Sequence, residues 1–228
     1  MRARGRLLAG LVALAALAGC GTDKTPNPMV AAVGALAKTS VAKLKGQEAA
    51  PAAQAPSAEA LRAELAKAGK PVLLVSSKTL GQTGFLMVSD AKRDVLTWAT
   101  PDGATFSQRN GVLIQTRGLG ADLMSAEVPS VGQLLQAGVP YQRVYYFLGA
   151  DDQGTRRTYD CATSIVGNEN IDVLGRNHSA SHVTETCTRS VSGGKITNEF
   201  WVEGSMIRQS RQFVSSGIGF VDFARVID

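Results

Sequence analysis

The chain has 228 residues and carries 24 lysines and arginines against 19 aspartates and glutamates. Three of the arginines lie within residues 1–19, so a chain that begins at Cys20 keeps 21 basic residues and a net charge of only +2. This near-balance excludes the basic footprint of a nucleic-acid-binding protein. The 208 residues after Cys20 suit one medium-sized domain and a tether.

The first twenty residues have the three-part layout of an export signal. Three arginines precede an apolar run from Leu7 to Gly19, which is too short to cross a bilayer core that needs about 20 apolar residues. The run ends in Leu17-Ala18-Gly19-Cys20, which is typical of a lipobox. We therefore expect residues 1–19 to be a lipoprotein signal peptide and Cys20 to be acylated, with palmitate or similar chains. The alternative is an ordinary secretory peptide whose cysteine is incidental.

The residues after Cys20 predict a membrane tether. In bacterial lipoprotein sorting, an aspartate directly after the acylated cysteine favours the inner membrane, so Gly21 predicts the periplasmic leaflet of the outer membrane. Within the tether, 20–57, apolar residues spaced by three and four predict a helix over 29–45. That helix fits either packing on its own domain or binding to a membrane surface or a partner. Residues 46–57 have two prolines and no large apolar side chain, so they are predicted to be a linker.

Residues 58–228 are predicted to form a β-rich periplasmic domain. Ser57 suits the N-cap of a short helix that ends by Lys67, and a second short helix is expected over 131–136. The predicted strands are 72–75, 85–88, 95–99, 105–109, 112–116, 141–148, 155–164, 171–174, 181–189, 195–202, 206–214 and 218–227. No helix-length pattern alternates with these strands. We therefore expect a mostly β fold, with an antiparallel sheet that is strongly curved or barrel-like.

Three strand signals and two tight turns occupy residues 93–123. Asn110-Gly111 separates two of the strands, and a two-residue Asn-Gly connection predicts a type I′ hairpin turn, because both positions need positive φ. After the third strand, the chain is predicted to leave the sheet as a loop that begins at Arg117.

Two motifs of the chain resemble the YjbF/GfcB family of lipoproteins, which is associated with exopolysaccharide and group 4 capsule production. The first is Arg109-Asn110-Gly111-Val112, followed by Thr116-Arg117-Gly118-Leu119-Gly120 and Asp122-Leu123, downstream of a strand that contains a tryptophan. The second is Asn198-Glu199-Phe200-Trp201-Val202, which turns at Glu203-Gly204 into a strand from Ile207 to Gln212. The resemblance implies a non-enzymatic outer-membrane lipoprotein that assists secretion or assembly of the polymer. It also implies that polysaccharide-export proteins, or the glycan itself, are partners, in addition to the membrane that acylated Cys20 contacts.

Cys161 and Cys187 are the two cysteines besides Cys20. In an exported protein, two such thiols are expected to form a disulfide, with a free reactive thiol as the alternative. Closing the 25 intervening residues would stabilise the fold by about 3 kcal/mol.

No residue pattern predicts catalysis or a cofactor. His178 and His182 have a spacing that binds zinc on a helix, but the glycine, asparagine and serines around them predict a solvated loop, so no metal is expected. Gly118 and Gly120 are followed by an acid rather than by the lysine and helix of a phosphate-binding loop. The chain has neither a Gly-x-Ser-x-Gly elbow nor a His-Glu-x-x-His motif.

The loop of Arg117, Gly118, Leu119, Gly120 and Asp122 is the predicted contact surface, because loops held by a rigid sheet often carry function. The strand aromatics leave two possibilities open, since a row of them can fill a core or stack on sugar rings. The alternative function is a LolB-like carrier of lipids or lipoproteins. An apolar concave face would favour that carrier, whereas a filled interior with polar or aromatic grooves outside would favour the polysaccharide function.

Overall fold

The computed structural model describes residues 56–148 and 154–228, which lie in one compact unit, Ala52–Asp228. The predicted signal peptide, Cys20, the tether and the helix over 29–45 lie outside the described residues. Within the described part of the chain, no helix is long and apolar enough to cross a membrane.

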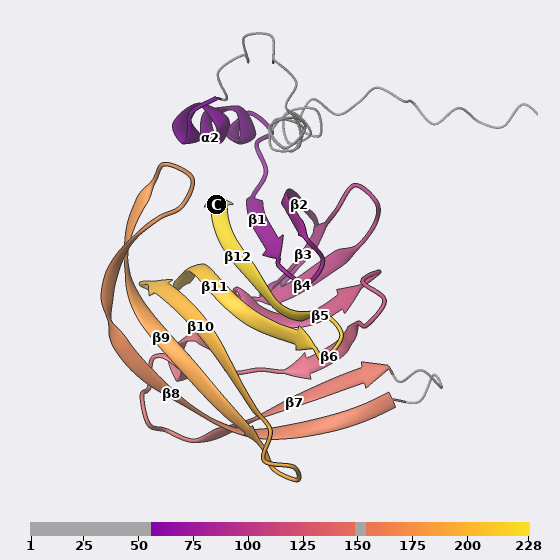
Figure 1. The fold of residues 1–228 in the computed structure, drawn as a ribbon. Helices are drawn as coiled ribbons and strands as arrows, with labels where there is room; N and C mark the ends of the chain where they lie inside the picture. The colour runs from indigo at the N-terminus through magenta and orange to yellow at the C-terminus, as the bar shows by residue number, and fades with distance from the viewer. Residues whose placement is uncertain (1–55, 149–153) are drawn as a thin grey trace, which may run out of the picture. The chain divides into compact units, whose positions relative to one another are not determined.

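Within residues 56–148 and 154–228, twelve strands form one antiparallel sheet in the order β5-β4-β3-β2-β1-β12-β11-β10-β9-β8-β7-β6 (Figure 1). The strands are β1 Val72–Ser77, β2 Gln82–Lys92, β3 Val95–Ala99, β4 Thr105–Arg109, β5 Val112–Arg117, β6 Leu123–Glu127, β7 Tyr141–Leu148, β8 Gly154–Asp172, β9 Asn177–Arg189, β10 Lys195–Glu203, β11 Met206–Ser215 and β12 Gly219–Ile227. The sheet curves until its edge strands, β5 and β6, lie close together, which leaves a nearly closed barrel. The predicted mostly β, antiparallel and strongly curved fold is therefore confirmed.

Three sequence predictions about strands were wrong. The separate strand expected over 171–174 does not exist, because β8 runs without a break to Asp172 and the chain then turns back through a Val173 to Arg176 backbone hydrogen bond of 2.8 Å. β9 begins at Asn177, four residues earlier than predicted. β6 was predicted as part of a loop. The missed parts of β8 and β9 are rich in polar residues, and β6 has only five residues, of which Leu123 alone is buried, so hydrophobic alternation does not reveal these segments.

In the part of the chain that the structure describes, two short helices accompany the sheet. α2, Ala58–Ala66, starts at Ser57, whose hydroxyl accepts a hydrogen bond from the Ala60 amide at 3.2 Å. α3, Val131–Leu134, is shorter than predicted and is closed by a capping box between Ser130 and Gln133. These residues therefore satisfy backbone donors that a helix leaves unpaired at its start.

Arg62 of α2 connects three parts of the domain. Its guanidinium donates to the backbone carbonyl of Leu174 at 3.0 Å, and to those of Val173 and Val226. The first two belong to the β8–β9 turn and the third to β12. This side chain thereby holds α2, the hairpin tip and the end of the sheet together.

The core has two apolar clusters. The larger fills the inside of the curved sheet, where Trp98, Tyr145 and Phe223 are at most 2 % exposed. The smaller lies under α3 and consists of Val112, Val131, Leu134, Val183, Phe200, Val202 and Ile207. Large side chains from several strands therefore fill the interior of the sheet together.

The β4–β5 turn docks on β11. Asn110 and Gly111 have φ values of 48° and 89°, as the predicted type I′ turn requires. The Gln212 amide donates to the Gly111 carbonyl at 2.8 Å and accepts from the Leu113 amide at 2.8 Å. A Cβ on Gly111 would lie only 2.9 Å from the Cβ of Ile207. This close approach requires glycine.

Gly111→Ala should lower the free energy of unfolding by about 1 to 3 kcal/mol, because it combines a left-handed backbone with a clash against Ile207. Urea denaturation would measure the change. Gly103→Ala is the matched control, since Gly103 has a similar φ of 92° but no atom within 4 Å of its added Cβ. Equal losses in the two variants would show that the docking contact is unimportant.

Candidate functional site

A charged pair lies inside the sheet. The Nη1 atom of Arg143, on β7, is 2.6 Å from Oε2 of Glu185, on β9, and the two side chains are 1 % and 0 % exposed. The Tyr141 hydroxyl donates to Glu185 Oε1 at 2.5 Å, and Asn198 Nδ2 donates to Oε2 at 2.6 Å. The carboxylate thus has three donors, as a buried charge requires.

Electrostatics favour the charged form of Arg143. Burial by itself lowers the pKa of the Arg143 guanidinium, but the neighbouring Glu185, Tyr145 and Tyr141 side chains raise that pKa above its ordinary value. Burial also raises the pKa of Tyr145 to about 12, partly offset by Arg143, whose Cζ lies 5.1 Å from the centre of the Tyr145 ring. Because neither side chain has access to solvent, the Arg143–Glu185 pair can hold β7 and β9 together but cannot reach a substrate.

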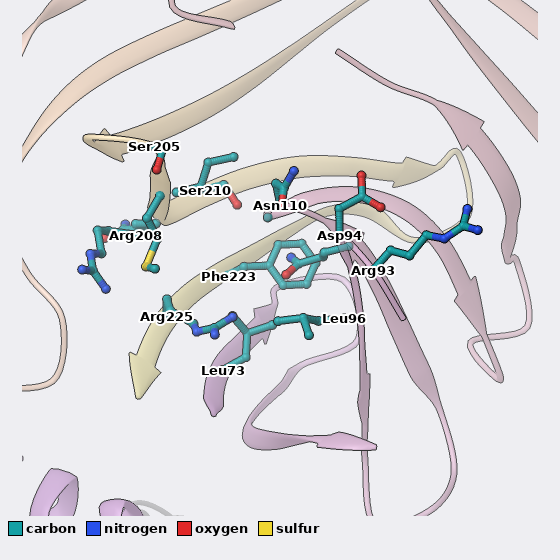
Figure 2. A pocket seen from close by; sticks show the side chains of 15 residues that line it. Leu73, Arg93, Asp94, Leu96, Asn110, Ser205, Arg208, Ser210, Phe223 and Arg225 are labelled. Carbon is teal, nitrogen blue, oxygen red and sulfur yellow. The ribbon is translucent and has the colours of Figure 1, made fainter. Parts of the chain in front are cut away.

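A cleft of about 340 Å³ opens where three turns of the sheet meet (Figure 2). Its lining comes from β1, β3, β4, β11 and β12, and from the β2–β3, β4–β5 and β10–β11 turns. Leu73, Leu96 and Phe223 give it apolar surface, and Gln108 and Ser210 give it neutral polar groups. The volume is at the lower end of the roughly 300 to 1,000 Å³ typical of small-ligand sites.

Arg225 is the cation that points into the cleft. Figure 2 shows its side chain extending from β12 toward Leu96, whereas the guanidinium groups of Arg93 and Arg208 point away. The Arg225 Cζ lies 4.8 Å from the centre of the Trp98 ring. Its Nε donates to the Ile227 carbonyl at 3.0 Å.

Arg208 and Arg225 differ in how their charge is balanced. Arg208 donates to Glu203 at 2.7 Å and to Asp228 at 2.7 and 2.9 Å, and these carboxylates raise its pKa despite partial burial. Among the described residues, the one carboxylate within 4 Å of Arg225 is that of Asp228, 3.8 Å from its Nε, and burial lowers the pKa of Arg225. Among the described residues, no acceptor forms a hydrogen bond with either Nη atom of Arg225. Its guanidinium therefore retains donors for a ligand.

The predicted contact loop is shaped by its own charges. The Asp122 carboxylate accepts hydrogen bonds from the Gly118 amide at 3.0 Å, the Leu119 amide at 3.2 Å and the Thr116 hydroxyl at 2.8 Å. The Arg117 guanidinium donates to the Thr116 carbonyl at 2.7 Å. Both charges stabilise the exit from β5. Their role as a contact surface, together with Gly120, stays a prediction.

Both histidines lie in β9: His182 falls within the strand predicted over 181–189, whereas His178 was predicted to lie in the solvated loop before it. His178 is buried and its Nδ1 is 3.0 Å from Glu203, whereas His182 Nδ1 is 2.8 Å from Glu169. Four residues along a strand cover about 13 Å, so the rings do not converge as they would on a helix. Each ring therefore belongs to a separate polar cluster. The glycine and serines around His178 did not reveal that β9 already begins at Asn177.

Cys161 and Cys187 are joined by the predicted disulfide, between directly paired positions of β8 and β9. Over residues 56–148 and 154–228, one group of metal-ligand type gathers closely, and it consists of these two cysteines and Glu185. Both sulfurs are used in the disulfide. The predicted pairing thus places a covalent link beside the buried charged pair.

The strand aromatics divide between the interior and the surface. Trp98, Tyr145 and Tyr159 are buried in the larger core cluster. Trp201 stays half-buried and stacks on His182, with 4.4 Å between ring centres, while its Nε1 donates to Glu169 at 2.7 Å. Core packing therefore accounts for most of these aromatics.

Sequence reasoning missed both Arg143 and Arg225. A usable signal existed for the first, because Tyr141, Arg143 and Tyr145 follow the period of two that faces side chains to one side of a strand. A basic residue between two aromatics in such a row indicates a buried cation with a partner. Arg225 offers no comparable local signal, since turns far apart in the sequence create its surroundings.

Comparisons with known proteins place the chain in a family. The sequence profile described as "Group 4 capsule polysaccharide lipoprotein gfcB, YjbF" matches residues 37–226. A crystal structure of the hypothetical lipoprotein YmcC from Escherichia coli (K12) shares the fold, with a TM-score of 0.63 and 21% sequence identity, over 77% of this chain and 98% of that one. A comparison with curated protein sequences gave no match. The chain therefore belongs to the YjbF family of group 4 capsule polysaccharide lipoproteins.

Proposed function

We propose that this lipoprotein assists secretion or assembly of an exopolysaccharide or capsule by binding the polymer, without catalysing a reaction. Its place would be the periplasmic leaflet of the outer membrane, where acylated Cys20 would anchor it beside the export proteins. The family supports the link to capsule polysaccharide. The observation that carries the binding function is the filled interior of the sheet.

A carrier of acyl chains needs an apolar cavity that the chains can enter. Here the inside of the sheet holds large side chains such as Trp98 and Tyr145, together with the fully buried Arg143 and Glu185. An acyl chain inserted beside this pair would break its ion pair or its hydrogen bonds and leave a buried charge unpaired, at a cost of several kcal/mol. The cleft beside Arg225 combines apolar lining with neutral polar and charged groups, which suits a hydroxylated ligand.

The arrangement of acids and bases also supports binding rather than catalysis. Glu185 is inaccessible, and Glu203 is engaged by Arg208 and His178, which lower its carboxyl pKa. Glu169 accepts hydrogen bonds from Trp201 and His182, which lower its pKa as well. Acids held ionised in this way are poor proton donors at neutral pH.

The test is to replace Arg117, Asp122, His178 and His182 by alanine, one at a time, and to measure surface polysaccharide in the native host. At a binding surface, each loss of a contact should cost about 1 to 2 kcal/mol, so every variant should retain some export. Immunoblotting would control for protein level. Complete loss of polymer from His178→Ala or His182→Ala at normal protein level would contradict binding and support an acid–base or metal role.

A further inference from the structure

We propose that the cleft binds a carboxylate-bearing sugar of the exported polymer, with the Arg225 guanidinium contacting the carboxylate. This inference rests on the proposed function and names the ligand class. The geometry behind it is a cavity of about 340 Å³ into which one cation is directed (Figure 2).

Arg225 is prepared for an anion. Its side chain is 16% exposed, so most of it is removed from water, while the nearest carboxylate in the described part of the chain, that of Asp228, is 3.8 Å away. The Trp98 ring beneath and the bond from Nε to the Ile227 carbonyl fix the orientation of the guanidinium. A planar guanidinium forms two parallel hydrogen bonds with a carboxylate, which gives both affinity and geometric selectivity. A bound anion would also give the largely buried Arg225 cation a counter-charge in direct contact with it.

The rest of the cleft matches a sugar ring better than a bare anion. The half-buried Leu96 offers apolar surface for the C–H face of a ring, and the largely buried Leu73 and Phe223, 3 % and 2 % exposed, complete the apolar lining. Gln108 and Ser210 are buried polar groups beside that surface. Their oxygens already accept hydrogen bonds from Trp98 Nε1 at 3.1 Å and Gln212 Nε2 at 2.9 Å, so they would meet ring hydroxyls through their N–H and O–H donors. A free phosphate would use the cation but none of the apolar surface. These neighbours therefore favour an acidic sugar.

The test uses the full mature chain in detergent and isothermal titration calorimetry with trigalacturonate. Trigalacturonate should bind, and neutral galactotriose should bind at least about 10-fold more weakly, because a hydrogen bond to a charged group contributes about 1.5 to 3 kcal/mol. Arg225→Gln should weaken trigalacturonate binding by about 10- to 100-fold. Arg225→Lys keeps the positive charge but lacks the planar guanidinium with its paired donors. Its affinity for trigalacturonate should therefore lie between those of the wild type and Arg225→Gln.

Arg189→Gln is the matched control, since it removes one positive charge from β9 and Arg189 does not line the cleft. It should leave the affinity for trigalacturonate unchanged. Thermal unfolding would show whether Arg225→Gln is folded, and if it is not, the comparison of acidic with neutral trisaccharide on the wild-type chain decides the question. Equal affinity for the two trisaccharides would overturn the proposal. Competition by inorganic phosphate as strong as that by trigalacturonate would also overturn it, in favour of a general anion site.

Failure of this inference is distinguishable from failure of the proposed function. Suppose that a strain without the protein exports less polymer, but that Arg225→Gln changes neither the binding of trigalacturonate nor export. The ligand site then lies elsewhere and the proposed function stands. If the strain that lacks the protein exports normally, the function itself fails.

Discussion

Glu185→Ala should lower the free energy of unfolding by about 3 to 5 kcal/mol, because it leaves the Arg143 cation buried without a counter-charge. The Tyr141 hydroxyl and the Asn198 amide lose their acceptor at the same time. Urea denaturation at neutral pH would measure the loss. A decrease of this size would take away a large share of the stability of an ordinary domain.

Glu199→Ala is the matched control for that change. Glu199 lies next to Asn198 on β10 and is only partly buried, so its removal should alter stability by at most about 0.5 kcal/mol. The double variant with Arg143→Met and Glu185→Leu should recover part of the loss, because it removes both buried charges together. If Glu185→Ala were as mild as Glu199→Ala, the charged pair would not be a supporting element of the fold.

Cys161→Ser should lower the free energy of unfolding by about 2 to 4 kcal/mol. The disulfide closes a loop in the unfolded chain, and without it the unfolded chain gains conformational entropy. Cys187→Ser should have the same effect, and combining the two should add little, since either change already breaks the bond. Two reactive thiols in the unreduced wild-type domain, detected by maleimide labelling, would contradict the disulfide.

Local sequence chemistry predicts much of this fold because neighbouring strands mostly pair with each other. Asn110-Gly111 sets a hairpin by its own backbone preference. The β-branched and aromatic residues between turn signals predict 95–99 and 105–109 with the bounds that the structure shows. Where a strand is largely polar, as β8 is beyond Ser164, pairing with β9 rather than composition decides its length. Hydrophobic patterning carries no information about that pairing.

The candidate site depends on contacts that local patterns do not encode. Arg143 and Glu185 are 42 residues apart and meet across β8, so their pairing follows from the register of three strands. The cleft beside Arg225 forms only when the β4–β5 turn docks against β11. The lipobox, in contrast, is a linear signal, and the acylation of Cys20 remains a prediction that mass spectrometry of the mature chain would check.

The central claim is that the protein assists export of a polysaccharide by binding it. The most direct measurement compares polymer at the cell surface with polymer retained in the periplasm, in strains with and without the protein. We expect surface polymer to fall and retained polymer to rise without the protein, with unchanged sugar composition and linkages. The full chain should restore export, and outer-membrane lipoproteins should stay at normal levels throughout. Altered linkages in the polymer, or export that is normal without the protein, would contradict this account.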